Sequence, residues 1–157
     1  MALAGEPDLI VADEPTTALD VTVQAQILDL LGQLVRERGL GLMLITHDMG
    51  VVAQVCDQVA VLYAGRLAET RDAPGLFARP RHPYTAALID CIPREGMAPG
   101  SLTGIPGAVP SAASYSAGCR FHDRCPRMLD RCRTEVPPLV ARPEGGSLAC
   151  HNPMGPT

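Results

Sequence analysis

The sequence contains no lysine, and all thirteen of its basic residues are arginine. A phosphate-binding P-loop needs a lysine that reaches the β- and γ-phosphates, together with a glycine-rich turn that cradles them. The absence of lysine therefore excludes a P-loop from these 157 residues. Tryptophan is absent and aromatic residues make up only 3% of the chain, which predicts a core of aliphatic side chains.

Long apolar runs are also missing, since none approaches the roughly 18–20 residues that cross a bilayer. The first residues lack the basic and apolar segments of a signal peptide. We therefore expect a cytosolic protein, in which disulfides rarely persist, so the six cysteines indicate metal binding or burial. The net charge of −4 argues against a general nucleic-acid binder.

Short apolar runs alternate with a helical pattern in the first half of the chain. Residues 9–12 and 42–45 are typical of strands covered on both faces. Between them, apolar residues recur at three- and four-residue intervals from the predicted N-cap Asp20 to Gly39. A short helix at 49–56, strands at 59–63 and 66–69, and helices at 74–78 and 83–91 are expected to follow. This order predicts an α/β layered domain.

Composition predicts four segments. Residues 1–73 form the α/β part, and 74–92 form a helical extension. Residues 93–118 are rich in glycine and proline without periodicity, which is typical of a linker. Residues 119–157 form an irregular, cysteine-rich C-terminal extension.

The first apolar run ends in two carboxylates, Asp13 and Glu14. Magnesium prefers hard oxygen ligands, and a carboxylate next to a phosphate chain can deprotonate an attacking water. The alternative is a pair of acids solvated in a turn, one of them capping a helix. The two residues alone leave both interpretations open.

Three motifs in order resemble ABC-transporter ATPases: Asp13-Glu14-Pro15 after a strand, residues 16–20 as a D-loop, and Thr46-His47-Asp48 as a switch-histidine segment. The resemblance implies the C-terminal part of a P-loop NTPase sheet, with ATP and Mg2+ as cofactors. It implies that Asp13 holds magnesium through water, that Glu14 is the general base and that His47 contacts the γ-phosphate. Asp20 would help to link two ATPase subunits across their shared sites. In a doubly wound sheet both strand ends open on the same edge.

A further segment, residues 81–85 with the sequence Arg-His-Pro-Tyr-Thr, resembles the C-terminal extension of oligopeptide and dipeptide importer ATPases. That resemblance implies peptide import driven by ATP hydrolysis at the cytoplasmic face of the cell membrane. The implied partners are a second ATPase subunit, membrane-spanning permease subunits and an external peptide-binding protein, without nucleic acid. The Walker A loop, Q-loop and signature loop would precede residue 1, so we expect the isolated chain not to hydrolyse ATP.

Four cysteines near the C-terminus are separated by five, six and seventeen residues: Cys119, Cys125, Cys132 and Cys150. Zinc sites more often contain cysteine pairs separated by two to four residues, whereas iron–sulfur ligands accept wider spacings. Five neighbouring arginines would offset the negative charge of a cluster. The segment also resembles the tail of peptide-importer ATPases, some of which carry a four-iron (4Fe–4S) cluster at these cysteines. We expect such a cluster, with zinc as the alternative, and a disordered tail as the simplest competing interpretation.

A different functional class remains open from the sequence. The same residues would also suit a non-enzymatic metal-binding or regulatory module that works without nucleotide, and the missing lysine favours this for the isolated chain.

Overall fold

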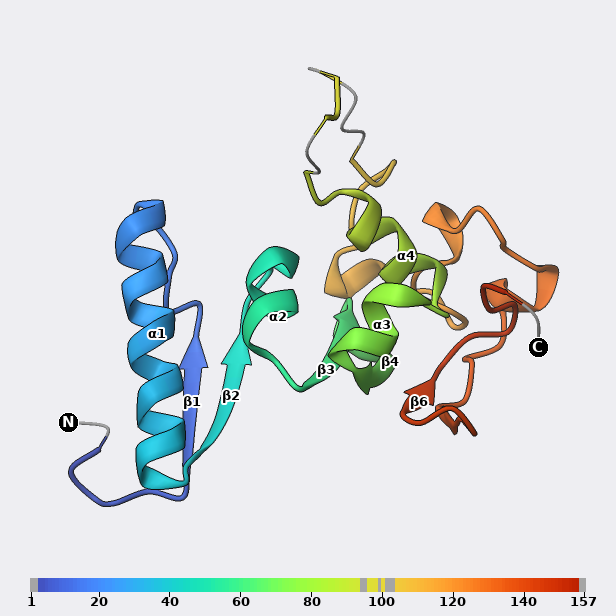
Figure 1. Cartoon of the computed structure of the whole chain (residues 1–157). Coiled ribbons are helices and arrows are strands. Elements are labelled where there is room, and N and C mark those ends of the chain that lie inside the picture. Colours follow the sequence, from blue (N-terminus) through green and yellow to red (C-terminus); the bar gives the residue numbers. More distant parts are fainter. Residues whose placement is uncertain (1–2, 94–95, 99, 101–103, 156–157) are drawn as a thin grey trace. The chain divides into compact units, whose positions relative to one another are not determined.

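The computed structural model describes residues 3–93, 96–98, 100 and 104–155, and it divides the chain into two compact units. Unit 1 comprises residues 1–56 and unit 2 comprises residues 57–157 (Figure 1). The boundary lies before the predicted one at residue 73, because the hairpin of residues 58–72 groups with the C-terminal segments. Parts of the predicted linker, residues 94–95, 99 and 101–103, lie outside the described residues.

Unit 1 is a strand–helix–strand unit followed by a short helix. Strand β1 (Leu9–Asp13) and strand β2 (Gly41–Ile45) pair in parallel, with Leu9 opposite Gly41 and Asp13 opposite Ile45. Helix α1 (Val21–Arg38) connects them, and helix α2 (Met49–Val55) follows β2 (Figure 1). The predicted strands and helices of this region are therefore present, with boundaries shifted by about one residue.

Helix α1 has the expected signals at both ends. Oδ1 of Asp20 accepts a hydrogen bond from the backbone N–H of Val23 at 2.9 Å, which satisfies one of the free N–H groups of the first turn. Gly39 ends the helix in the left-handed conformation with φ of 66°, which glycine adopts without steric cost. Arg36 and Arg38 lie in the last turn, where positive charge is favoured by the helix dipole.

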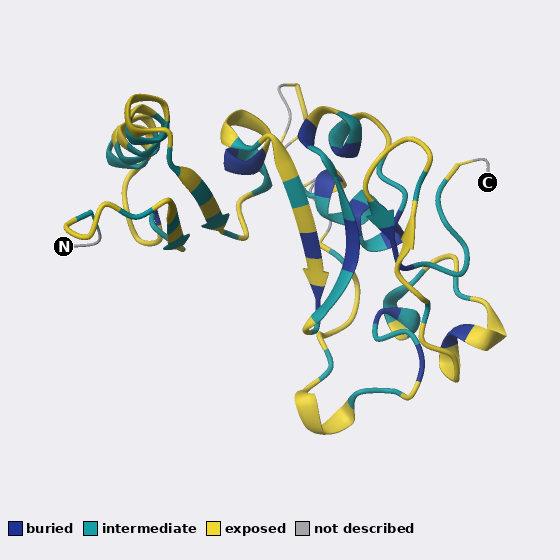
Figure 2. Ribbon diagram, turned by 90° about the horizontal axis from the view of Figure 1, so that it is seen from below, coloured by how far each residue is buried: buried dark blue, intermediate teal, exposed yellow. Residues whose placement is uncertain are grey.

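The strands of unit 1 alternate between half-buried and exposed positions. Ile10, Ala12, Leu42 and Leu44 are half-buried, whereas the residues between them are exposed. Among the described residues of unit 1, only Thr16, Val51 and Val52 are fully buried (Figure 2). The sequence predicted strands covered on both faces, and in this unit only one face is covered.

Unit 2 begins with an antiparallel hairpin. Strand β3 (Gln58–Tyr63) pairs with β4 (Arg66–Asp72), and the turn between them places Ala64 and Gly65 at φ of 48° and 76°. Two successive positive φ values are typical of the tight hairpin turn that matches strand twist. Helices α3 (Ala73–Ala78) and α4 (Pro83–Asp90) follow, each with proline in its first turn as predicted.

The cysteine-rich segment adds two short strands to this hairpin. Strand β5 (Val140–Ala141) pairs with β6 (Ser147–Leu148), and β6 pairs with β4, which gives the order β3-β4-β6-β5. Short 3-10 turns occupy residues 112–114, 122–124 and 130–133. Two-residue strands carry no readable periodicity, so the sequence did not reveal them.

The core of unit 2 is partly aromatic. Phe121 is 2% exposed, and its ring lies 5.1 Å from that of Tyr63 and 5.3 Å from that of Tyr84, both at steep angles. Leu76 on α3 and Thr85 on α4 are also fully buried. The prediction of an aliphatic core is wrong for this unit, because three of the chain's five aromatic residues gather in one place. In this way Phe121 ties the cysteine-rich segment to the hairpin and to α4.

No helix in the part of the chain that the structure describes is long and apolar enough to cross a membrane.

Candidate functional site

The carboxyl ends of β1 and β2 bring the predicted catalytic residues together. Asp13 is the last residue of β1, and the N–H of Glu14 donates to the carbonyl of Ile45 at 2.9 Å, which continues the strand pairing by one residue. His47 follows β2 after one intervening residue. Oε1 of Glu14 lies 2.8 Å from Nδ1 of His47. The parallel pairing therefore places a carboxylate and an imidazole in direct contact at one edge of the sheet.

The turn after β1 fixes the side chain of Glu14. Its backbone is left-handed, with φ of 47°, a conformation that typically costs a non-glycine residue about 1–3 kcal/mol. The carbonyl of Glu14 accepts the N–H of Thr17 at 3.2 Å, and the Thr17 hydroxyl donates to Oε2 of Glu14 at 2.8 Å. Both carboxylate oxygens of Glu14 thus have a hydrogen-bond partner: Oε2 is bonded to Thr17 in the turn, and Oε1 is bonded to His47 beyond the end of β2.

The electrostatics of the pair favour its charged form. Hydrogen bonds from His47 and then Thr17 lower the pKa of the Glu14 carboxyl below its ordinary value. The hydrogen bond to Glu14, aided by the charges of Glu14 and Asp48, raises the pKa of the His47 imidazole. The His47 side chain is 83% exposed and that of Glu14 is 36% exposed, so Glu14 is a solvent-accessible carboxylate next to an imidazole that holds its proton more firmly than usual.

Two neighbouring acids have structural partners. Asp20, predicted to link two subunits, caps α1 through Oδ1. Asp48 caps α2 by accepting the N–H groups of Gly50 and Val51 on its Oδ1, while Oδ2 lies 3.5 Å from the side-chain amide of Gln24. The sequence reasoning gave no role to the Thr17 hydroxyl or to Gln24. A threonine hydroxyl can donate a hydrogen bond to a nearby carboxylate, and the sequence carries no further signal for this contact.

The edge is acidic and lacks the cation that a triphosphate needs. Asp13, Glu14, Asp20 and Asp48 surround it, whereas the two arginines of unit 1 lie in the last turn of α1, at the opposite end of that helix. Carboxylate oxygens suit Mg2+, and the N-terminal end of α1 opens on the same side as the carboxyl end of β1. These carboxylates are ligands of the kind that Mg2+ prefers, but no group of three or more histidine, cysteine or acidic side chains in the described part of the chain has the arrangement of a metal site.

The predicted cysteine ligands belong to one part of unit 2. The N–H of Cys119 donates to the carbonyl of Cys132 at 2.8 Å, and Sγ of Cys150 accepts the N–H of Asn152 at 3.4 Å. Burial raises the pKa of the Cys119 and Cys125 thiols, and it raises the pKa of Cys150 to about 11. The charges of neighbouring cysteines add to each shift, and backbone N–H groups oppose it.

These thiols are near one another but do not form a closed ligand set. Among the described residues, no group of three or more histidine, cysteine or acidic side chains has the arrangement that could hold a metal ion. The structure therefore does not support the predicted iron–sulfur cluster or the zinc alternative, and the metal remains a prediction.

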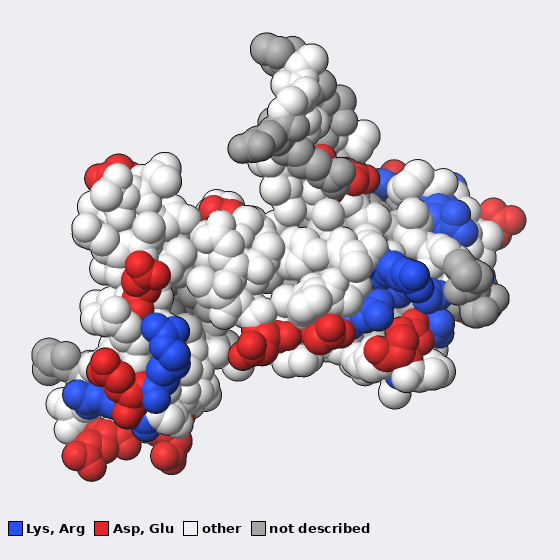
Figure 3. All heavy atoms as spheres, viewed as in Figure 1, with Lys and Arg blue, Asp and Glu red and all other residues white. Residues whose placement is uncertain are grey.

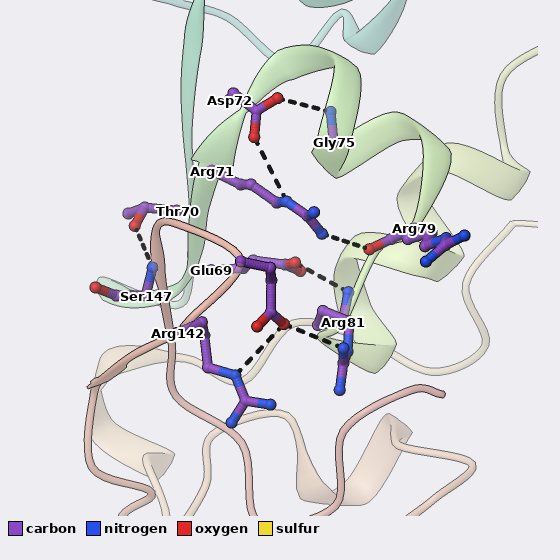
Figure 4. A network of polar contacts seen from close by, with 10 residues as sticks. Glu69, Thr70, Arg71, Asp72, Gly75, Arg79, Arg81, Arg142 and Ser147 are labelled. Carbon is purple, nitrogen blue, oxygen red and sulfur yellow. Dashed lines mark hydrogen bonds and ion pairs between the residues drawn. The ribbon is translucent and has the colours of Figure 1, made fainter. Parts of the chain in front are cut away.

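The His-Pro-Tyr segment is anchored by a buried acid. Both oxygens of Glu69, which is 2% exposed, accept backbone N–H groups. Oε1 accepts from Arg81 at 2.9 Å (Figure 4), and Oε2 accepts from His82 at 2.8 Å. His82 in turn caps α4, because its Nδ1 accepts the N–H of Tyr84 at 3.0 Å. Burial lowers the pKa of His82 to about 4, so this imidazole is neutral at pH 7. These hydrogen bonds hold the start of α4 against strand β4.

Three arginines on unit 2 lie within ion-pair distance of acidic side chains. Arg81 contacts Glu144 at 3.1 Å, Arg142 lies 3.6 Å from the same carboxylate, and Arg71 lies 3.5 Å from Asp72. Blue and red atoms accordingly lie side by side over this part of the surface (Figure 3).

Comparison with known proteins identifies the class. Residues 68–132 match the family model described as "Oligopeptide/dipeptide transporter, C-terminal region". The chain is 51% identical over 151 residues to the "Probable peptide ABC transporter ATP-binding protein y4tS" of Sinorhizobium fredii, covering 96% of this chain and 43% of that protein. It is 46% identical over 154 residues to the "Dipeptide transport ATP-binding protein DppD" of Escherichia coli, covering 98% and 47%.

Among solved structures, cbiO1 of Clostridium perfringens, part of the ABC transporter complex cbiONQ, is 34% identical with a TM-score of 0.44, over 46% of this chain and 29% of that one. The sequence matches bear out the resemblance to ATP-binding subunits of peptide transporters, and residues 68–132 match the C-terminal region of that family. The chain spans just under half the length of the curated relatives it matches.

Proposed function

We propose that the chain supplies the water-activating side of the ATP site in an ABC importer for peptides. The observation that carries this proposal is the contact between Glu14 and His47 at the carboxyl ends of two parallel strands, 2.8 Å between Oε1 and Nδ1. Its support is the similarity to ATP-binding subunits over 96–98% of the chain.

Each residue would have a separate task. Asp13 would hold Mg2+, which would neutralise phosphate charge when bound. Glu14 would accept a proton from the attacking water, a task for which an exposed, ionised carboxylate is suited. Thr17 and His47 keep the Glu14 side chain in one orientation by hydrogen bonds to its two oxygens. His47 would donate its other ring N–H to the γ-phosphate, and Asp20 would lie at the contact with a second ATPase subunit.

The proposed partners follow from the similarity to peptide-transport proteins. They are a second ATPase subunit, permease subunits in the membrane and an external peptide-binding protein, with peptides as cargo. The chain would then act as a peripheral protein at the cytoplasmic face of the cell membrane.

Peptide uptake provides the test. A chimera in which this chain replaces the matching part of DppD is expressed in E. coli cells that lack DppD. We expect dipeptide uptake to be restored, and Glu14→Gln to abolish it, while the exposed control Asp29→Asn on α1 leaves it intact. Uptake that is independent of Glu14 would refute the assigned role.

We propose, second, that the four cysteines hold a four-iron (4Fe–4S) cluster. A single zinc ion bound at about 2.3 Å from each sulfur draws four thiolates close together, whereas a cluster places its own iron and sulfide between them. The charges of other cysteines in the set contribute to the raised pKa of Cys119, Cys125 and Cys150, so the four thiols lie near one another, and this proximity supports the proposal. Backbone N–H groups near three of the sulfurs would stabilise thiolate charge.

Anaerobic purification tests the cluster. We expect iron and sulfide at about four each per chain, and loss of both in Cys132→Ser. Stoichiometric zinc without iron, or neither metal in protein folded under iron-replete conditions, would reject it.

A further inference from the structure

Unit 2 contains a small cavity of about 40 Å³. One water molecule needs roughly 10–15 Å³ of such space, so the cavity has room for a group about three water molecules in size. Much of its wall is apolar or aromatic and comes from segments far apart in the sequence: Tyr63, Phe121, Val136, Pro137 and Ala149. A wall of this kind suits a short aliphatic group better than it suits water.

The charged residues in the wall are two arginines. Nη1 of Arg66 donates to the carbonyl of Gly118 at 3.4 Å, and Nη1 of Arg120 donates to the carbonyl of Ala64. His82 also lines the cavity, but its imidazole is neutral at pH 7 because burial lowers its pKa to about 4. The cavity therefore combines an apolar wall with two positive charges that are held in place by backbone carbonyls.

These two arginines differ from the others in unit 2 that contact acids. In the described part of the chain neither Arg66 nor Arg120 lies within ion-pair distance of an acid, whereas Arg71, Arg81 and Arg142 do. The guanidinium group of Arg120 instead lies over an aromatic ring, that of Tyr115, at 3.8 Å from its centroid. The positive charge at the cavity is thus not neutralised by a carboxylate of the described chain.

Arg120 also has an unused donor. Its Nε is buried and has no hydrogen-bond partner among the described residues. Buried N–H groups are nearly always paired, so an unpaired one beside a cavity indicates an acceptor that is not part of this chain. An anionic acceptor satisfies both the free N–H group and the unpaired charge.

The cysteine set offers a competing explanation for the two arginines. Cys119 lines the cavity, and the charge of Arg66 acts on its thiol, so the arginines could serve only to offset the charge of a cluster. The wall of the cavity, as far as the chain is described, includes none of the other three proposed ligands. The cavity therefore lies beside the cysteine set, and its ligand can be tested separately from the metal.

We propose that this cavity binds a short aliphatic group whose carboxylate is held by Arg66 and Arg120. Burial of the aliphatic part against the apolar wall favours binding, and charge-assisted hydrogen bonds from the guanidinium groups fix the carboxylate. Two sources offer this chemistry: a free short branched acid, and the C-terminal residue of a peptide. The site is separate from the residues proposed for ATP hydrolysis, and the proposal does not depend on them.

An NMR titration of the full chain, purified anaerobically, tests the site with isovalerate. The backbone amides of residues 63–68 and 118–121 should shift, with a dissociation constant in the millimolar range that is usual for so small a ligand. Isovaleramide has the same shape without the charge and should bind about ten-fold or more weakly. Arg66→Gln and Arg120→Gln should each weaken isovalerate binding by a similar factor. The control Arg133→Gln, at an exposed position outside the wall, should leave binding unchanged.

Further measurements separate the sources and the competing explanation. N-acetyl-leucine presents the end of a peptide, so the tighter of this probe and isovalerate identifies the source. Iron per chain should be the same in the wild type and in both glutamine variants. Parallel loss of iron and of binding in both variants would overturn the proposal, because the arginines would then serve the cysteines. Equal binding of isovalerate and isovaleramide by the wild type, which does not depend on how the variants fold, would overturn it too, as would no shift at tens of millimolar isovalerate.

Discussion

Glu14 and His47 are 33 positions apart in the sequence, yet Oε1 of one lies 2.8 Å from Nδ1 of the other. Parallel pairing causes this, because the N–H of Glu14 bonds to the carbonyl of Ile45 and so aligns the two strand ends. A carboxylate that accepts hydrogen bonds from both His47 and Thr17 has little freedom to turn away. The turn after β1 therefore presents Glu14 in a fixed orientation.

The charge state of this pair is measurable by NMR. Glu14 raises the pKa of His47, so its ring should titrate above 6.5, and Glu14→Gln should return it toward that value. The mutual stabilisation is present between the two pKa values. It is lost as the pH falls through the lowered pKa of Glu14 and as it rises through the raised pKa of His47. An unchanged His47 titration in Glu14→Gln would show that the contact does not persist in solution.

The positions of the candidate site residues could be predicted from the sequence more fully than the packing of unit 2. Asp13, Glu14 and His47 follow apolar strands, so the βαβ order was enough to place them on one edge. The neighbours of Phe121 were not readable, since contacts with Tyr63 and Tyr84 join segments separated by more than 35 residues and by no periodic pattern. Strand β6 pairs with β4 and β5 pairs with β6, across more than 70 residues between β4 and β6, so no local pattern announces them. The fold of unit 2 thus depends on contacts between segments far apart in the sequence, and local sequence patterns do not predict such contacts.

Acid should destabilise unit 2 through His82. Its pKa falls from 6.5 to about 4 on burial, so the unfolded chain binds more protons between these values and stability decreases as the pH falls through this range. The full effect is about 3 kcal/mol. Urea unfolding followed by tyrosine fluorescence reports on unit 2, which contains all three tyrosines. His82→Asn, which keeps a side-chain acceptor for the N–H of Tyr84, should flatten the dependence, and an equally steep curve would contradict this assignment.

Replacing the buried Glu69 should lower the free energy of unfolding more than replacing an exposed acid does. Glu69→Gln turns one of two buried acceptors into a donor that faces a backbone N–H, which should cost roughly 1–3 kcal/mol. Glu144→Gln, whose carboxylate is part of a more exposed ion pair, should cost clearly less, because solvent screens that pair. Urea unfolding of both variants at pH 7 makes the comparison. Equal losses would mean that Glu69 does not anchor residues 81 and 82.

Phe121 should couple the hairpin to the cysteines. Phe121→Ala removes a ring that is 2% exposed, at an expected cost of about 3–5 kcal/mol. Cys119 lies two residues away, so its thiol should react faster with a thiol reagent in the metal-free protein. Leu129→Ala, at a position 38% exposed, is the control and should change neither property greatly. Unaltered thiol reactivity in Phe121→Ala would separate the cysteines from the aromatic core.

Steady-state ATP turnover by the purified DppD chimera tests the central claim most directly. The account predicts magnesium-dependent hydrolysis by the chimera, no hydrolysis by the isolated chain, and a fall of about 10²–10⁴-fold in the chimera with Glu14→Gln but not with Asp29→Asn. Turnover that persists at the wild-type rate in Glu14→Gln, or magnesium-dependent hydrolysis by the isolated lysine-free chain, would contradict it.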